Sequence, residues 1–232
     1  AEQADLQDGD VVCVASTIVS KAAGRQANLD DFPASERAER IADGIAAIAG
    51  EEKDPRFAQA IIEESEEILT EAPFILAVTR FGHITVNAGI DRSNVPGADL
   101  LLLPEEPTDC AERIRSGLQT RLDVDVAVIV TDTSGRPFRL GQRGVALGWA
   151  GMAAARDWRG ESDREGRELS ATVQAVVDEL AAAGDEIAGG GTPVAVVREF
   201  DFGDHAGSDE LYRPNDKDVV RDALREWSYV RD

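Results

Sequence analysis

An acid, hydroxyl residues and two arginines stand close together in the stretch TDTSGRPFRLGQ, residues 131–142. The stretch follows residues 124–130, a run rich in Val and Ile that predicts a buried strand. Ser-Gly-Arg-Pro then predicts a turn. We therefore expect Asp132 and Thr133 at the carboxyl end of a central strand, which is where open α/β sheets bind their ligands.

These residue types suit a metal ion and a phosphate. The carboxylate of Asp132 and the hydroxyl of Thr133 offer the oxygen ligands that hard cations prefer. The guanidinium groups of Arg136 and Arg139 can bind anionic oxygens through two hydrogen bonds at once. The alternative is a polar loop that caps the strand and holds no ligand.

Two further segments carry candidate phosphate ligands. Residues 11–19 (VVCVASTIV) predict a strand entering the loop SKAAGR, where Lys21 is one of only three lysines beside 21 arginines. Because lysine is so scarce, we expect Lys21 to meet phosphate oxygens, although the loop lacks the P-loop pattern. The run Gly189-Gly190-Gly191 precedes a predicted strand, and its N–H groups could also bind phosphate. The alternatives are a solvated connection and a flexible link.

A third segment gathers oxygen-bearing side chains. It is NAGIDRSNVPG, residues 87–97, in which Asp91, Ser93 and Asn94 lie close together. Such oxygens can hold a hard cation or a ribose-phosphate. The alternative is an Asx-turn, in which Asp and Asn bind their own backbone.

The elements that must position these segments alternate between helices and strands. Apolar spacing predicts helices over residues 33–49, from Asp54-Pro55 towards Pro73, from Asp109 to Leu122 and from Leu169 to Ala183. A short last helix is expected near residues 218–227. Strands are expected at residues 74–79 and 84–88, which form a hairpin, and at 100–103 and 193–197. Glycines within residues 145–152 predict close backbone packing.

Composition excludes several classes of function. The formal net charge is −21, which repels nucleic acid and anionic lipid. No apolar run is long enough to span a membrane and no signal peptide is visible, so we expect a cytoplasmic protein. The two cysteines form no zinc motif. A surface rich in Asp and Glu and poor in Lys is typical of a salt-loaded cytoplasm, as in extreme halophiles.

Four motifs, in this order, give the chain a family resemblance: SKAAGR, NAGIDRSNVPG, TDTSGRPFRLGQ and TPVAVVR. Together they resemble the coenzyme F420-0:L-glutamate ligases over nearly the whole chain. The resemblance implies a mixed α/β fold, with a mixed sheet and flanking helices, in an intertwined homodimer. It implies GTP-dependent addition of L-glutamate to F420-0, with two Mg²⁺ or Mn²⁺ sites and K⁺.

The resemblance also implies roles for individual residues. Asp91, Asp132 and Thr133 would be metal ligands. The nucleotide and its phosphates would contact Ser16, Thr17, Lys21, Asn94 and the glycine-rich segment that contains Gly189, Gly190 and Gly191. Arg136 and Arg139 are our candidate catalytic residues, for the acyl phosphate or the substrate carboxylates.

The sequence departs from the family pattern in three places. The family has a strand and a nucleotide-contacting loop ahead of DGDVV, so we expect the single domain of residues 1–232 to lack that strand. A further metal ligand is usual before PVAVV, where this chain has three glycines, so either Asp185 or Glu186 supplies it or it is missing. Gly144 stands where the family more often has an acid.

The expected mechanism is phosphoryl transfer from GTP to the F420-0 carboxylate, followed by attack of the glutamate amine on the acyl phosphate. Two other functions stay open. One is a metal-dependent GTP hydrolase or phosphotransferase that acts on another carboxylate. The other is a non-catalytic nucleotide-binding module. Dependence of nucleotide cleavage on glutamate separates the ligase from the first, and tight GTP binding without cleavage would indicate the second.

Overall fold

The computed structural model describes residues 5–93, 95–188, 191–203 and 205–227. The chain forms two compact units, each assembled from separate parts of the sequence. The first unit contains residues 1–19 and 106–211, and the second contains residues 20–105 and 212–232. Among the described residues, no helix combines the length and the apolar character that crossing a membrane would require.

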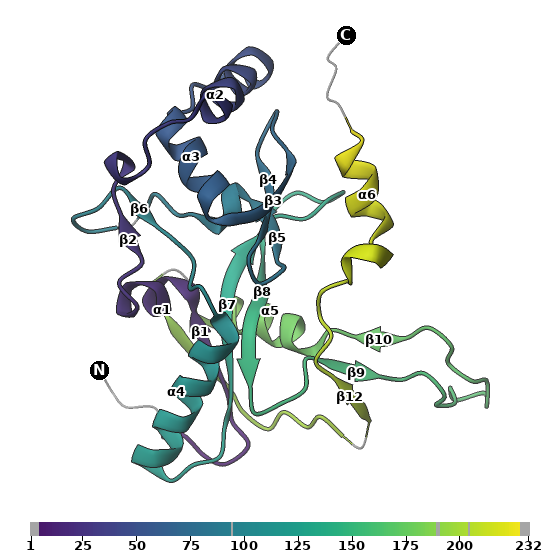
Figure 1. Cartoon of the computed structure of the whole chain (residues 1–232). Helices are drawn as coiled ribbons and strands as arrows, with labels where there is room; N and C mark the ends of the chain where they lie inside the picture. Colours follow the sequence, from purple (N-terminus) through teal and green to yellow (C-terminus); the bar gives the residue numbers. More distant parts are fainter. Residues whose placement is uncertain (1–4, 94, 189–190, 204, 228–232) are drawn as a thin grey trace. The chain divides into compact units, whose positions relative to one another are not determined.

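A four-stranded mixed sheet forms the centre of the first unit, in the order β11-β1-β7-β8 (Figure 1). Its strands are β1 (Val11–Ala15), β7 (Ala127–Ser134), β8 (Arg143–Ala150) and β11 (Val194–Val197). β1 and β7 are parallel, whereas β1–β11 and β7–β8 are antiparallel. The predicted mixed sheet, with β7 in a central position, is therefore confirmed.

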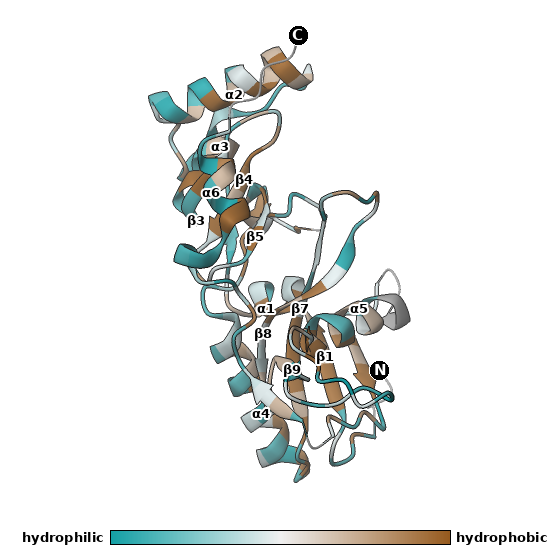
Figure 2. Ribbon diagram, turned by 90° about the vertical axis from the view of Figure 1, so that its right-hand side faces the viewer, coloured by the Kyte–Doolittle hydropathy of each residue, from teal (hydrophilic) through white to brown (hydrophobic). Residues whose placement is uncertain are grey.

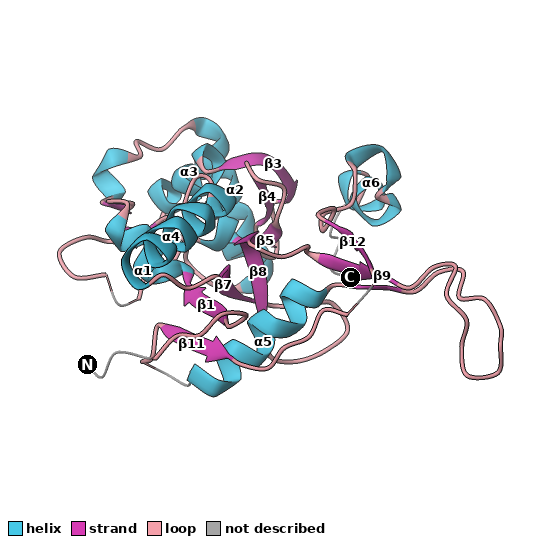
Figure 3. Ribbon diagram, turned by 90° about the horizontal axis from the view of Figure 1, so that it is seen from below, coloured by secondary structure: helices cyan, strands magenta, loops and turns pink. Residues whose placement is uncertain are grey.

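Helices cover both faces of this sheet. Val128 and Val130 of β7 pack in the cluster that includes residues of α4 (Pro107–Leu122), while Ile129 packs with α5 (Val176–Ala188). The alternation follows from the period of two along a strand. Figure 2 shows the apolar character of these strands, and Figure 3 shows α4 and α5 on opposite sides of them. This burial fixes the position of β7 and of the polar residues at its end.

Three short strands complete the first unit. They are β9 (Ala155–Asp157), β10 (Val173–Gln174) and β12 (Ala206–Ser208), paired antiparallel in the order β10-β9-β12. The charged segment between β9 and β10 is largely exposed, as its composition predicts.

The second unit packs helices against a three-stranded antiparallel sheet, β3-β4-β5. The helices are α2 (Glu36–Ala49), capped by Ser35, and α3 (Pro55–Glu63), capped by Asp54 with Pro55 at the first helical position. The strands are β3 (Ser65–Thr70), β4 (Leu76–Thr79) and β5 (Ile84–Val86). The short pair β2 (Gln26–Ala27) and β6 (Leu100–Leu101), and α6 (Val219–Arg225), complete the unit. The Asp54-Pro55 start, the β4–β5 hairpin and the last helix confirm the predictions.

Two apolar segments form a different type of secondary structure from the predicted one. The first strand ends at Ala15, and Ser16–Ala22 form the helix α1. Thr17, Ile18 and Val19 are β-branched and suggest a strand, but packing of Ile18 and Val19 against the α4 cluster favours a helix. In the second unit, Ile68 and Leu69 belong to β3 rather than to the preceding helix, which ends at Glu63.

Two helix starts are also wrong. α4 begins at Pro107, two residues before the predicted Asp109, because proline is already accommodated at the first helical position. The helix predicted from Leu169 begins at Val176, because Val173 pairs with Asp157 in the β9–β10 ladder. In both cases a nearby pairing or turn decides the boundary.

Candidate functional site

The carboxyl ends of β1 and β7 bring two candidate residues together in the first unit. The parallel register pairs Ala15 with Thr131, so the next residues, Ser16 and Asp132, are neighbours. The Ser16 hydroxyl donates a hydrogen bond of 3.1 Å to Oδ1 of Asp132. Ser16 is buried and Asp132 is half-buried. This hydrogen bond helps to fix the orientation of the Asp132 carboxylate near the end of β7.

Asp132 and Thr133 lie on opposite faces of β7. Alternation along the strand places Asp132 on the face of Val128 and Val130, where α4 packs. Thr133 is exposed on the other face and pairs with Gly144 of β8. The two predicted metal ligands are thus adjacent in the chain, but their side chains point in opposite directions.

A bulge in the β7–β8 ladder lies one step before Asp132. Val130 pairs with Gly148 and Thr131 pairs with Ala146, so β8 carries one more residue than β7 across this step of the ladder. Bulges increase the local twist and re-aim side chains, and they are frequent next to functional sites. The bulge therefore changes the direction of the strands just before Asp132.

The loop from residue 135 to residue 142 carries Arg136 and Arg139. Arg136 is half-buried, and its Nε is buried without a hydrogen-bond partner among the described residues. Arg139 is exposed. Between and after them, Phe138 and Leu140 are almost fully exposed, at 105% and 99%. The loop therefore exposes Arg139, Phe138 and Leu140 to solvent, whereas Arg136 is partly covered.

The helix α1 carries the predicted nucleotide contacts of the first motif. Ser16 and Thr17 are in its first turn, and Lys21 is in its last turn and half-buried. The strand and loop predicted for these residues are wrong, because they form a helix, and their nucleotide contacts stay a prediction. The helix begins directly at the end of β1, which leaves Ser16 beside Asp132.

In the second unit, Asp91 follows a turn of unusual backbone geometry. Three successive residues, Asn87, Ala88 and Gly89, have positive φ angles of 54°, 53° and 69°. Such conformations are costly for residues other than glycine and are concentrated at functional sites. Asp91 itself pairs with Leu101 in an isolated bridge, with backbone N–O distances of 3.0 Å and 2.8 Å. The backbone of Asp91 is therefore held firmly.

The side chain of Asp91 closes the Asx-turn that the sequence left open as an alternative. Its Oδ1 accepts hydrogen bonds from the backbone N–H and the hydroxyl of Ser93, at 2.7 Å and 2.8 Å. An Asx-turn leaves the other carboxylate oxygen for another partner. Asn94, the predicted nucleotide contact beside it, lies outside the described residues.

The predicted metal ligands are divided between the units: Asp132 and Thr133 belong to the first and Asp91 to the second. Within the part of the chain that the structure describes, no group of three or more His, Cys, Asp and Glu residues could hold a metal ion. The available donors are single carboxylates with neighbouring hydroxyls. This donor set fits Mg²⁺, which usually binds one or two carboxylates together with water and substrate phosphates.

The glycine-rich segment is only partly described. Gly189 and Gly190 lie outside the described residues, and so does the side chain of Glu186. Gly191 has a φ of 108°, a conformation that side chains rarely adopt. Asp185, the other candidate for the extra metal ligand, is exposed near the end of α5.

Gly144 has a structural explanation that its sequence context did not provide. A Cβ at this position would lie 2.6 Å from the carbonyl oxygen of Ala181 and 2.8 Å from Cα of Ala182. β8 therefore packs directly against the backbone of α5, and no side chain fits between them. In this chain an acid at position 144 would require α5 to move.

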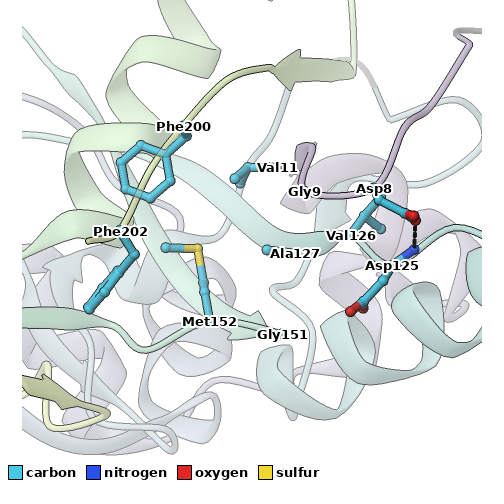
Figure 4. A pocket seen from close by; sticks show the side chains of 10 residues that line it. All are labelled: Asp8, Gly9, Val11, Asp125, Val126, Ala127, Gly151, Met152, Phe200 and Phe202. Carbon is cyan, nitrogen blue, oxygen red and sulfur yellow. Dashed lines mark hydrogen bonds between the residues drawn. The ribbon is translucent and has the colours of Figure 1, made fainter. Parts of the chain in front are cut away.

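A pocket of about 320 Å³ lies at the opposite end of the sheet from Asp132. It is lined at the start of β1 by Asp8, Gly9 and Val11, and near the start of β7 by Asp125. Figure 4 shows Phe200, Phe202 and Met152 along its other side. None of the residues that line it is a predicted site residue, so cavity size alone does not indicate the candidate site.

Sequence reasoning missed a pair of cations in the second unit, Lys53 and Arg92. Both lie over the ring of Phe57, with Lys53 Nζ at 4.8 Å and Arg92 Cζ at 5.2 Å from its centroid. The scarcity of lysine was the signal that could have found Lys53, but it was applied only to Lys21. Arg92 lies inside the NAGIDRSN motif and was passed over as a neighbour of Asp91.

Comparisons with known proteins agree over most of the chain. A family model described as F420-0:Gamma-glutamyl ligase matches residues 1–199. The chain is 74% identical to the coenzyme F420:L-glutamate ligase of Haloarcula marismortui, in a match that covers 100% of this chain and 91% of that protein. It is 44% identical to the protein of the same name from Archaeoglobus fulgidus, over 95% of this chain and 87% of that protein.

Proposed function

Because the chain belongs to the F420-0:gamma-glutamyl ligase family, we propose that it joins L-glutamate to coenzyme F420-0 with GTP as the energy source. Family membership over residues 1–199 is the observation that carries this proposal. The placement of Ser16 and Asp132 at the carboxyl ends of two parallel strands supports it, because α/β sheets bind ligands there.

The reaction proceeds in two steps that balance in atoms and charge. A carboxylate oxygen of F420-0 attacks the γ-phosphorus of GTP, the bond to the β-phosphate oxygen breaks, and GDP leaves. The glutamate amine then attacks the acyl carbon, the C–O bond to phosphate breaks, and inorganic phosphate leaves with loss of an amine proton. The first step needs in-line positioning and neutralisation of charge more than covalent help from the protein.

Mg²⁺ or Mn²⁺ would neutralise charge on the phosphate oxygens when bound, and K⁺ completes the proposed set of ions. Asp132 and Thr133 of the first unit and Asp91 of the second are the proposed ligands of the two divalent sites. Asp132 keeps its carboxylate oriented through the hydrogen bond from Ser16. The side chain of Thr133 lies on the other face of β7, so its proposed role as a ligand does not rest on its pointing in the same direction as Asp132.

The cations and polar groups of the chain bind the anionic substrates. Lys21 supplies a point charge to the nucleotide phosphates, beside contacts from Ser16 and Thr17. Arg136, whose buried Nε lacks a partner among the described residues, has donor capacity for the acyl phosphate or a substrate carboxylate. Arg139 is proposed for the same anions. Asn94 and the segment of Gly189, Gly190 and Gly191 complete the nucleotide contacts.

A homodimer is part of the proposal. Phe138 and Leu140 are almost fully exposed in one loop, where they offer apolar surface for contact with a second subunit. Sedimentation equilibrium in molar KCl tests it: a dimer is expected, and Phe138→Ser with Leu140→Ser should weaken it. A monomer at all concentrations would contradict this part alone.

One assay tests the reaction. F420-0, L-glutamate, GTP and Mn²⁺ are incubated with the protein in molar KCl, and products are identified by mass spectrometry. Glutamyl-extended F420 and GDP are expected, and GDP should form over repeated turnovers only when both other substrates are present. Repeated turnovers of GTP cleavage without glutamate would indicate a hydrolase or another phosphotransferase. Tight binding of GTP without cleavage would indicate a non-catalytic module.

A further inference from the structure

Lys53 and Arg92 form a cation pair that shares one aromatic ring. Both lie about 5 Å from the centroid of Phe57, one as an ammonium and the other as a guanidinium. Lys53 is half-buried and Arg92 is exposed. Two like charges near the same ring repel each other, so the arrangement is unfavourable unless something else compensates for it.

The described part of the chain provides no ion pair for either cation. Other arginines of the second unit form close ion pairs with acids, such as Arg25 with Glu64 at 2.5 Å and Arg56 with Asp30 at 2.6 Å. Lys53 and Arg92 form no such pair among the described residues, in a chain that carries 45 acids against 24 cations. Acids are near, since Glu51 acts electrostatically on Lys53 and Arg92 acts on Asp54, but within the described structure neither acid forms an ion pair with these two cations.

The electrostatics of Lys53 are those of a cation that is poorly solvated and lies near another cation. Burial lowers the pKa of Lys53, the charge of Arg92 lowers it further, and Glu51 opposes both effects. A bound anion would act in the same direction as Glu51 and favour the charged form of Lys53.

The pair also borders the turn that presents Asp91. Lys53 Nζ donates a hydrogen bond of 3.0 Å to Oδ1 of Asn87, the first of the three residues with positive φ. Arg92 directly follows Asp91 in the chain. An ammonium has three N–H donors, and Asn87 uses one of them. The remaining donors of Lys53 and the fork of Arg92 can bind oxygens of a ligand at this turn.

We propose that Lys53 and Arg92 bind an oxyanion, a carboxylate or a phosphate group, of one of the substrates. The proposal deepens the proposed function and rests on it for the identity of these substrates. GTP, F420-0 and L-glutamate all carry such groups, and the experiment below determines which of the three substrates binds here. Phe57 provides the apolar floor, which lowers the local dielectric and strengthens the interaction.

Amine footprinting reads the site without any need for turnover. The protein has only three lysines, and reductive dimethylation followed by mass spectrometry reports each of them. Labelling rates are measured with no ligand, with GTP and Mg²⁺, with L-glutamate, with F420-0 and with inorganic phosphate. We expect at least one substrate to slow the labelling of Lys53 by about fivefold or more. Lys217, exposed in the last segment of the second unit, should label at one constant rate and serves as the internal control.

Kinetics with matched variants identify the role of Lys53. Lys53→Met keeps the stem over Phe57 but removes the charge, and Lys217→Met removes the same charge elsewhere. Loss of a charge-assisted contact should raise the KM of one substrate by about 10–100-fold in Lys53→Met. Lys53→Arg should restore most of the affinity, and Arg92→Gln should raise the KM of the same substrate.

Asn87→Gly removes the hydrogen-bond partner of Lys53 and tolerates the positive φ at this position, so it separates anion binding from support of the turn. If Lys53 only holds the turn, Asn87→Gly should reproduce the effect of Lys53→Met and Lys53→Arg should not rescue it, and that result overturns the proposal. Equal labelling of Lys53 with and without every ligand also overturns it.

The two hypotheses fail separately. If no glutamylated product forms but GTP or phosphate protects Lys53, the proposed function fails and the anion site stands. If product forms while Lys53 is never protected and no KM changes more than twofold, the function stands and the anion site fails.

Discussion

The two units hold a candidate carboxylate in different ways. In the first unit, Asp132 is the sixth residue of an eight-residue strand that is paired on both sides within the central sheet, and Ser16 orients its side chain. In the second unit, Asp91 follows three residues of left-handed backbone, and Ser93 closes a turn around its side chain. Regular pairing holds one acid, and a strained turn holds the other.

The difference shows where each unit can tolerate change. The first unit packs backbone against backbone, so it has no space for additional atoms at Gly144 or Gly148. The second unit stores strain at Ala88 and keeps a buried histidine, His83, that has no hydrogen-bond partner for Nε2 among the described residues. We therefore expect the first unit to be sensitive to volume, and the second to be sensitive to pH and to relief of backbone strain.

The largest expected effect is on turnover, through Asp132. Asp132→Asn removes a carboxylate charge that the proposed metal site needs, and metal-ion catalysis contributes several kcal/mol, so turnover should fall by about 10³-fold. The urea midpoint of unfolding should change little. Glu112→Gln, an exposed acid on α4, is the matched control and should retain activity. Near-normal turnover of the Asp132→Asn variant would contradict the proposal that Asp132 is a metal ligand.

The next effect tests packing in the first unit. In Gly148→Ala the new methyl group would lie well inside contact distance of the backbone of Pro107 and Thr108, at the start of α4. Because backbone atoms cannot rotate away, we expect a loss of about 3 kcal/mol in the free energy of unfolding.

Gly117→Ala on α4 is the control for Gly148→Ala. A Cβ at position 117 meets nothing within 4 Å. That variant should gain about 0.5–1 kcal/mol from helix propensity. Equal urea midpoints for the two variants would show that the backbone contact at Gly148 is not rigid.

A comparable effect is expected from pH in the second unit. Burial lowers the pKa of His83 from 6.5 to about 4. The unfolded chain therefore binds a proton below pH 6.5 that the folded chain rejects, and folding stability falls as the pH decreases from 6.5 to 4. Over that window the loss is about 3 kcal/mol from this group. Above pH 6.5 the group contributes no pH dependence.

The chain's two histidines allow a matched test of this effect. Urea unfolding at pH 7 and pH 4.5 measures how far the free energy of unfolding falls with acid. His83→Gln should remove the part of that fall that comes from His83. His205→Gln, in the first unit, should leave it intact. If the free energy of unfolding falls by the same amount in the wild type and both variants, the pH sensitivity comes from carboxylates instead.

The smallest expected effect is a gain. Ala88 has a φ of 53°, and left-handed backbone costs a residue with a Cβ about 1–2 kcal/mol relative to glycine. Ala88→Gly should relieve that strain, but it also removes a buried methyl group and loosens the unfolded chain, so we expect a net stabilisation of at most about 1 kcal/mol. A rise of a few degrees in melting temperature, with Ala98→Gly as a control without positive φ, would confirm that the turn stores strain.

Sequence patterns predicted the features of this molecule that depend on short segments. The apolar run before Thr131 and the turn residues after Ser134 were enough to locate β7 and to place Asp132 at its end. Asp54-Pro55 marked the start of α3 for the same reason, since a cap and a proline act within one turn. Such signals are local, so a single sequence contains them in full.

Features that depend on distant residues were not predictable. α1 was missed because Thr17, Ile18 and Val19 have strand propensities that only packing against the α4 cluster overrides. The pairing of Lys53 with Arg92 was missed because residues 39 positions apart meet over Phe57. The glycine at position 144 made sense only when the backbone of α5 was found against it.

The parallel pairing of β1 with β7 has a consequence for synthesis on the ribosome. Ser16 and Asp132 are separated by 116 positions, and all of residues 20–105 is translated between them. β1, an apolar strand, therefore leaves the ribosome long before its parallel partner exists. Because pairing between distant segments must first close a long loop, the first unit should fold late and slowly relative to chain elongation. During that interval β1 has an open edge, and the nascent chain depends on β1 finding no other strand to pair with.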